Sequence, residues 1–302
     1  MKTVLFVLGG GIGNIVQATP AIKAIAAKGF VVDLKLHCNS TKDVESIFHI
    51  PAVRKVFVKD NPPGTYDFQL NGPFTSKIKH RAKKFLKTKV YYAQNAPEVN
   101  VYFDLAKQLG VTGVVPEIEI NLPQKGFKPE HKDTVAIYPG SKPNWAMKRW
   151  NKYDRLAEQF KHTMIVGTSD DIHSHGKPTW ITRPWNWPPN ATFFQGGLRE
   201  VAYAISKCKM FIGNDGGLAH IAAATKIPTF VLFGPSSQMK NKPYAKNAHV
   251  VAICLRCQPC QFKTSGNGDQ IFNANRASCM HNMKCMRDMS VQYVISKINA
   301  LL

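Results

Sequence analysis

Short apolar runs alternate with segments of helical periodicity along both halves of this 302-residue chain, and this alternation restricts the fold more than any other feature. In the first half we predict strands over 4–8, 31–37 and 53–58 and helices over 15–26 and 103–110. In the second half we predict strands over 134–138, 163–166, 210–213 and 228–233 and helices over 153–160, 198–206, 218–224 and 291–302. Such alternation is typical of a doubly wound parallel sheet, so we predict an α/β protein.

Between residues 114 and 132 the chain is rich in proline, glycine and charge, which is typical of an interdomain linker. A chain of 302 residues suits two domains, each with its own core. We therefore predict two Rossmann-like domains, one over residues 1–130 and one over residues 131–302. Two such domains place a ligand in the cleft at the carboxyl ends of their strands.

The first apolar run is predicted to be a buried strand and not an export signal. It ends at Gly9, Gly10 and Gly11 without the small-residue cleavage site of a signal peptide. We find no apolar stretch of about 18 residues that could form a membrane-spanning helix. The seven cysteines do not require an oxidising compartment, because a chain of this size can form its own core. We therefore expect a cytoplasmic protein.

The chain carries a large excess of positive charge. Lysine and arginine number 40 against 19 aspartates and glutamates, which gives a formal net charge of +21. A compact protein with this charge repels itself, so we expect the surplus to serve a polyanionic partner. Nucleic acid, a phosphorylated glycolipid and an anionic membrane surface all fit that description.

A glycine-containing turn lies where the predicted strand 210–213 gives way to the predicted helix 218–224. Gly216 and Gly217 let the backbone approach a ligand closely, and the start of the helix favours an anion such as a diphosphate. Asp215 and His220 could reach a sugar in the same cleft. Asp215 could equally cap the helix, and the spacing alone does not separate these two interpretations.

Three ordered segments resemble the heptosyltransferase-type glycosyltransferases of family nine, which have the GT-B fold. They are 213–235, then 138–142 together with 148–150, and Gly11–Val16 together with 19–22. The resemblance covers most of the chain and implies two Rossmann-like domains that face each other across a cleft. It also implies an inverting glycosyltransferase, with a nucleotide-diphosphate sugar as donor and no catalytic metal.

The resemblance carries specific roles onto residues of the C-terminal half. Ser141 matches the hydroxyl that contacts the donor phosphates, and Lys148 matches the lysine that neutralises the diphosphate leaving group. Fixed cations and helix N–H groups are suited to stabilise that developing charge. An acid after the strand 163–166, Asp170 or Asp171, matches the position that contacts the ribose. The donor set implied by the resemblance is Ser141, Lys142, Lys148, Asp171, Asp215, Gly216, Gly217 and His220.

The acceptor side departs from the family pattern at one position. Gly11, Gly13 and Asn14 match the N-terminal loop, but the family commonly has aspartate as the general base where this chain has Asn14. Asparagine cannot take a proton at neutral pH. Three outcomes remain open: Asn14 only orients the acceptor, another group takes the proton, or activity has been lost. The candidates for that other group are Asp67, His80 and His220.

The stretch between Asp67 and Glu98 contains no acid and many cations. Its predicted acceptor-binding residues are Lys77, Lys79, Arg81, Lys83 and Lys84, and Tyr91 and Tyr92 follow. Cations beside aromatic side chains suit a nucleic-acid backbone, although a solvated helix face would look similar. Charge therefore favours hydroxymethylated cytosine in DNA as acceptor, as in bacteriophage DNA modification. The alternatives are phosphorylated lipopolysaccharide core and a non-catalytic nucleic-acid-binding protein built on a transferase fold.

Five of the seven cysteines lie between residues 254 and 285. Cys257 and Cys260 have the spacing of half a zinc site, and Cys279 and Cys285 could supply the other half. A disulfide and free thiols remain open as alternatives. A zinc ion held by four thiolates would be structural, because it leaves no open ligand position.

Overall fold

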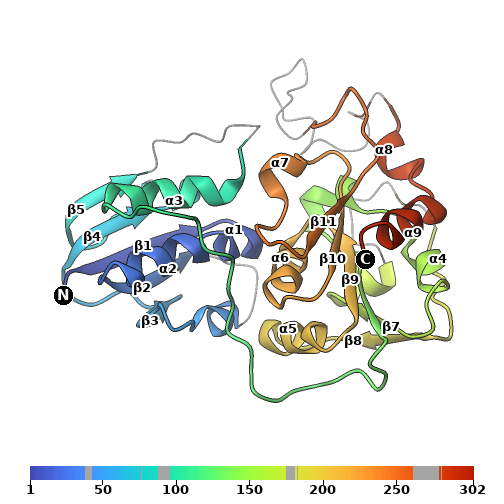
Figure 1. Cartoon of the computed structure of the whole chain (residues 1–302), viewed down its shortest axis with the longest axis horizontal. Coiled ribbons are helices and arrows are strands. Elements are labelled where there is room, and N and C mark those ends of the chain that lie inside the picture. The colour runs from blue at the N-terminus through green and yellow to red at the C-terminus, as the bar shows by residue number, and fades with distance from the viewer. Residues whose placement is uncertain are drawn as a thin grey trace.

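The computed structural model shows two lobes, each built on one parallel β-sheet (Figure 1). It describes residues 1–37, 43–75, 77–87, 96–174, 181, 183–260, 279 and 281–302. The predicted tyrosine pair at 91 and 92 lies outside these ranges. No helix within these ranges combines the length and the hydropathy needed to cross a membrane.

The N-terminal lobe has a five-stranded sheet in the order β3-β2-β1-β4-β5. Its strands are β1 (Thr3–Gly9), β2 (Val31–His37), β3 (Lys55–Phe57), β4 (Tyr66–Asn71) and β5 (Ala82–Lys87). Its helices are α1 (Ile12–Val16), α2 (Thr19–Ala27) and α3 (Glu98–Gln108), with short 3₁₀ turns at Val44–Phe48 and Pro73–Thr75. All strand pairs are parallel, as the alternation of strand and helix predicts.

The C-terminal lobe has a six-stranded parallel sheet in the order β11-β10-β9-β6-β7-β8. Its strands are β6 (Val135–Tyr138), β7 (Thr163–Val166), β8 (Ala191–Phe194), β9 (Met210–Asn214), β10 (Thr229–Leu232) and β11 (Ala248–Val251). Its helices are α4 (Tyr153–Ala157), α5 (Leu198–Ser206), α6 (Gly217–Ala224), α7 (Gln238–Asn241), α8 (Lys284–Arg287) and α9 (Val291–Asn299). A 3₁₀ helix at Pro143–Lys148 and one π-helical turn at Asp170–Ser174 complete this lobe.

The central strand β1 shows why its sequence is apolar at every position. Val4, Phe6 and Leu8 join a core that also contains residues of α2 and α3. The intervening Leu5 and Val7 pack on the other face of the sheet. Because successive side chains of a strand point to opposite faces, burial on both faces requires an unbroken apolar run.

The predicted helix 15–26 is two helices in the structure. The first helix, α1, ends at Val16, and the Thr19 hydroxyl donates to the Val16 carbonyl at 2.7 Å. Pro20, which has no N–H group, lies in the first turn of α2. Of these two helices, α1 is the one that lies next to the other lobe (Figure 1).

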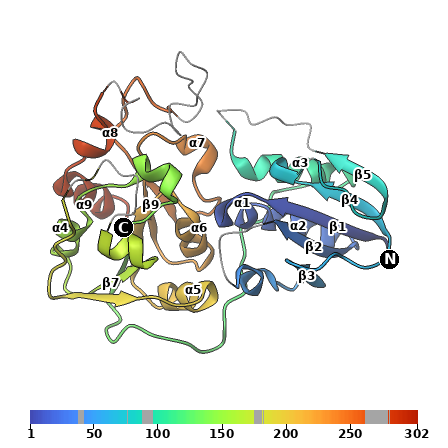
Figure 2. The same ribbon diagram turned by 180° about the vertical axis from the view of Figure 1, so that it is seen from behind.

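The lobes touch through α1 and α6, which face each other in both views (Figures 1 and 2). An added Cβ on Gly217, the first residue of α6, would lie 3.2 Å from the Cβ of Ile12 in α1. Ile221 and Ala223 of α6 belong to the same apolar cluster as β1. The ends of β1, β6 and β9 are therefore held close to one another.

Candidate active site

A cavity of about 980 Å³ lies between the two lobes and takes its walls from both. It lies just beyond the carboxyl ends of β1, β6 and β9, where parallel sheets bind ligands. The predicted donor and acceptor residues that line it are Gly11, Gly13, Asn14, Ser141, Lys142, Lys148, Asp171, Asp215, Gly216, Gly217 and His220. The structure thus brings the three resembling segments together around one space.

Lys148 and Asp215 form a buried ion pair on the C-terminal wall of this cavity. Lys148 Nζ lies 2.7 Å from Asp215 Oδ2, and Asn241 Nδ2 donates to the same oxygen at 3.1 Å. Burial lowers the pKa of Lys148, and Asp215 opposes that shift. Burial alone would raise the pKa of Asp215, but Lys148, Ser236 and His220 together bring it below its ordinary value. Charges held out of water in this way act strongly on an anionic ligand.

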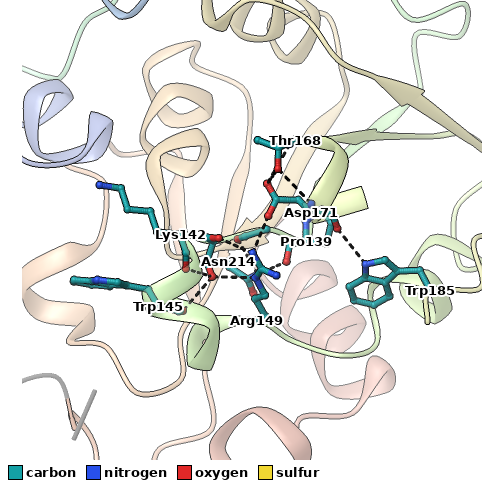
Figure 3. A network of polar contacts seen from close by, with 10 residues as sticks. Pro139, Lys142, Trp145, Arg149, Thr168, Asp171, Trp185 and Asn214 are labelled. Atoms are coloured by element: carbon teal, nitrogen blue, oxygen red, sulfur yellow. Dashed lines mark hydrogen bonds and ion pairs between the residues drawn. The ribbon is translucent and has the colours of Figure 1, made fainter. Parts of the chain in front are cut away.

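Asn214 fixes the turn that precedes α6. Its Nδ2 donates to the Pro139 carbonyl at 2.8 Å, and its Oδ1 accepts from the Tyr153 hydroxyl at 2.9 Å. The bond to Pro139 ties the end of β9 to the segment after β6 (Figure 3), and the bond from Tyr153 ties it to the start of α4. Because α6 begins at Gly217 on the cavity wall, the positive end of its dipole faces the space where a ligand would bind.

Arg149 is the centre of a second buried network, shown in Figure 3. Its guanidinium donates to the Ser141 carbonyl at 2.6 Å, to the Ser141 hydroxyl at 3.1 Å and to Asp171 Oδ1 at 3.0 Å. The other carboxylate oxygen of Asp171 accepts from the Thr168 N–H and hydroxyl at 3.1 and 2.8 Å. Both oxygens of Asp171 are therefore engaged within the protein. The contact of Asp171 with a ribose stays a prediction, and exposed Asp170 lines the cavity beside it.

His220 packs directly against the N-terminal lobe. An added Cβ on Gly13 would lie 2.6 Å from His220 Cδ2, so only glycine fits at position 13 in this arrangement. Burial lowers the pKa of His220 to about 4, although Asp215 opposes that shift. The imidazole is therefore neutral at neutral pH, and its Nδ1 is buried with no hydrogen-bond partner among the described residues.

This burial predicts a specific dependence of stability on pH. Between pH 6.5 and about 4 the unfolded chain protonates His220 and the folded chain does not, so the free energy of unfolding falls as the pH drops. The loss from this side chain should reach about 3 kcal/mol near pH 4. Denaturant unfolding of the wild type and of His220→Gln at several pH values in this window measures this loss. The contributions of the other histidines are the same in both proteins, so they cancel when the two free energies of unfolding are subtracted. An equal loss of unfolding free energy in the wild type and in His220→Gln would show that His220 is not the source of this pH dependence.

Glu98, Lys240 and Asn241 also line the cavity, and none of them is among the site residues predicted from the sequence. Glu98 begins α3, and its carboxylate accepts from Asn14 Nδ2 and lies 3.7 Å from Lys240 Nζ. One sequence signal pointed to Glu98, because it is the first acid after the long basic stretch. Lys240 and Asn241 form the last turn of α7, and no motif marks them.

The structure does not bring Asp67 to the cavity. Asp67 lies at the beginning of β4, at the opposite end of the sheet, where it accepts from the Thr3 N–H at 2.8 Å and pairs with Lys83 at 2.7 Å. The bond from Lys83 lowers the pKa of Asp67 to about 2. His80 is not among the residues that line the cavity either. Neither side chain is in position to take a proton from a substrate in this cavity.

The predicted acceptor-binding cations form an exposed surface away from the cavity walls. Lys77, Lys79, Arg81, Lys83 and Lys84 are all exposed, and the last two belong to β5. Residues 82–87 form the edge strand β5, and residues 77–81 precede it outside any helix, so the alternative of a solvated helix face is wrong for these residues. Its role in acceptor binding stays a prediction.

The four cysteines predicted to bind zinc all lie within the described residues, and Cys285 is close enough to the other three to interact with them. Burial, followed by the proximity of Cys260, Cys279 and Cys257, raises the pKa of the Cys285 thiol to about 12. No disulfide joins the cysteines that the structure describes, and no three metal-binding side chains come together there as a metal site. The structural zinc is therefore not confirmed and stays a prediction.

Metal analysis of the purified protein tests the zinc prediction. About one zinc ion per chain, lost when Cys257 and Cys260 are both replaced by serine, is the expected result for a four-thiolate site. The variant Cys208→Ser is the matched control, because Cys208 is buried in another part of the C-terminal lobe. Purified protein that contains no zinc would show that the prediction is wrong.

The two facing parallel sheets and the cavity between them define a GT-B glycosyltransferase fold. The same fold occurs in E. coli ADP-heptose lipopolysaccharide heptosyltransferase II, with a TM-score of 0.66 and 17% identity over 100% of this chain and 98% of that one. It also occurs in the dodecameric iron-containing heptosyltransferase TibC in complex with ADP-D-β-D-heptose, with a TM-score of 0.67 and 16% identity over 99% of this chain and 76% of that one.

Sequence comparisons find similarity to one family over part of the chain. Residues 190–270 match glycosyltransferase family 9 (heptosyltransferase). The chain is 30% identical over 106 residues to lipooligosaccharide heptosyltransferase 2 of Campylobacter jejuni, which is 35% of this chain and 29% of that protein. It is 23% identical over 202 residues to lipopolysaccharide heptosyltransferase 2 of Escherichia coli K12, which is 62% of this chain and 53% of that protein. The chain thus matches at most about half the length of these relatives. A segment of the chain therefore matches glycosyltransferase family 9, and parts of the chain are similar in sequence to the heptosyltransferases.

Proposed function

We propose that this chain transfers a heptose-type sugar from a nucleotide-diphosphate sugar, such as ADP-heptose, to a hydroxyl of phosphorylated lipopolysaccharide core. The observation that carries the proposal is the cavity between the lobes, where Lys148 and the start of α6 face the same space. Relatives named as lipopolysaccharide and lipooligosaccharide heptosyltransferases support the sugar and the acceptor.

The C-terminal wall has the chemistry needed to bind and release a diphosphate. In the transfer, the acceptor oxygen bonds to the anomeric carbon while the bond from that carbon to the phosphate oxygen breaks, and the diphosphate leaves with the electron pair. Negative charge therefore develops on the leaving group. Lys148, exposed Lys142 and the N-terminus of α6 stabilise it, because they are already oriented before the reaction begins.

Hydroxymethylated cytosine in DNA, the acceptor that the charge favours, has no support from the comparisons, which favour the lipopolysaccharide alternative. The net charge of +21 does not separate the two, because lipopolysaccharide core also carries phosphates. The exposed cations of residues 77–87 suit a phosphorylated acceptor of either kind.

One assay tests the function and the acceptor together. The protein is incubated with ADP-heptose or other nucleotide sugars and with either heptose-deficient lipopolysaccharide or hydroxymethylcytosine duplex DNA, and mass spectrometry detects the product. The expected result is one added heptose on the lipopolysaccharide and none on the DNA. Sugar on the DNA alone would restore the DNA acceptor, and no transfer with any pair would reject the proposed function.

A further inference from the structure

Glu98 is a buried carboxylate on the N-terminal wall of the cavity. Its side chain is 4% exposed, yet it lines the space that Asn14 and Gly13 also line. Its Oε1 accepts from Asn14 Nδ2 and from the Tyr102 hydroxyl at 3.3 Å, and Lys240 Nζ lies 3.7 Å from its Oε2. Burying a charged carboxylate away from water costs free energy. The burial of Glu98 beside the cavity therefore indicates a functional role.

Asn14 holds this carboxylate in a fixed direction. The Gly11 N–H donates to Asn14 Oδ1 at 2.7 Å, so the amide group turns its Nδ2 toward Glu98. Both polar atoms of Asn14 are therefore occupied within the protein. Asn14 cannot itself take a proton, but it can position a group that does.

The other ionisable groups on the cavity walls are less suited to accept a proton from an acceptor hydroxyl. Asp215 is paired with Lys148, and both oxygens of Asp171 are engaged by Arg149 and Thr168. His220 packs against Gly13, and its Nδ1 is buried with no hydrogen-bond partner among the described residues. The remaining acids that line the cavity are the exposed Asp43 and Asp170.

We propose that Glu98 is the general base of the transfer reaction and that Asn14 is its positioning residue, an inference that rests on the proposed function. As the acceptor oxygen bonds to the anomeric carbon and the diphosphate leaves, the hydroxyl proton passes to a carboxylate oxygen of Glu98. The Lys240 ammonium balances the negative charge of the carboxylate before transfer. The proton-accepting group thus comes from α3, 84 residues beyond the position at which a base is expected from the family resemblance.

The variant Glu98→Gln tests the proposal, because it keeps the shape of the side chain and removes its basicity. We expect kcat to fall at least about 100-fold while the dissociation constant for ADP-heptose changes less than about threefold. Glu119→Gln is the matched control. It makes the same chemical change at a half-exposed glutamate that pairs with Lys23 outside the cavity, and it should keep wild-type kcat.

The double variant Asn14→Asp with Glu98→Gln exchanges the two groups across their hydrogen bond. We expect it to recover at least about tenfold of the rate lost in Glu98→Gln, because a carboxylate is again present at the N-terminal wall. A purely structural role would not predict this recovery together with unchanged donor binding. For Asn14 as a positioning residue, Asn14→Ala should lower kcat without weakening donor binding.

The outcomes separate the two proposals. If the wild type transfers sugar and Glu98→Gln retains more than about a tenth of its kcat, the assignment of Glu98 is overturned and the proposed function stands. Loss of donor binding in folded Glu98→Gln also overturns the assignment. If the wild type transfers to no acceptor, both proposals fail. If Glu98→Gln does not fold, the double variant Asn14→Asp with Glu98→Gln tests the assignment instead. If that double variant folds but transfers no sugar, Glu98 is not the general base.

Discussion

Replacing Lys148 by methionine should lower the transfer rate about 1,000-fold, which corresponds to about 4 kcal/mol of lost transition-state stabilisation. The ammonium lines the cavity and is buried, so water cannot replace it when the diphosphate leaves. The same change should lower the free energy of unfolding by about 3–5 kcal/mol, because Asp215 is left as a buried charge without its cation. Steady-state kinetics and denaturant unfolding measure the two effects separately.

Two further variants separate catalysis from stability. Lys142→Met removes an exposed cation from the same cavity, so its unfolding free energy should change by less than about 0.5 kcal/mol. Lys148→Met combined with Asp215→Asn removes the unpaired charge, so it should regain stability without regaining activity. Restored transfer in this double variant would contradict the role given to Lys148, as would wild-type kinetics in Lys148→Met alone.

The second large effect is expected at Gly140, which follows β6. A Cβ added there would lie 2.2 Å from the Asp171 Cγ, and Arg149 and Thr168 hold that carboxylate in place. Gly140→Ala should therefore lower the free energy of unfolding by about 2–3 kcal/mol through overpacking and displacement of the buried network. Denaturant unfolding measures this loss directly.

The cost of Gly140→Ala should depend on Asp171. With Asp171→Ala as the background, the new methyl group meets no carboxylate, and the additional loss should fall below about 1 kcal/mol. The same cost in both backgrounds would show that the clash with Asp171 is not the cause. The double-mutant cycle therefore tests the packing around Gly140 independently of any activity.

The fold was predictable where burial dictates residue type. The strand β7 is a mostly apolar run of the observed length, β2 has the predicted bounds with apolar residues at four of its seven positions, and α5 has the bounds that its periodicity predicts. The strand β5 was not predictable in this way, because it is an edge strand with mostly exposed residues and therefore lacks an apolar pattern. The split between α1 and α2 depends on the local bond from Thr19 and on Pro20.

The candidate site was predictable on its C-terminal wall, where the backbone turn and its charged side chains lie close together in sequence. Asp215, Gly216 and His220 all follow one strand, so local sequence determines their arrangement. Glu98 was not selected, because it meets Asn14 only when α3 packs beside α1. Asp67 is the opposite case. An aspartate could act as a base, but this one lies at the end of β4 that is far from the cavity.

The exposed strand β5 has a consequence for solubility as well as for acceptor binding. Among the described residues no further strand pairs with its outer side at the edge of the N-terminal sheet, where another chain could add a strand. Lys83, Lys84 and Lys87 place repelling charges along that edge and oppose such pairing between copies of the protein. Neutralising them to study acceptor binding would therefore also remove a barrier to self-association.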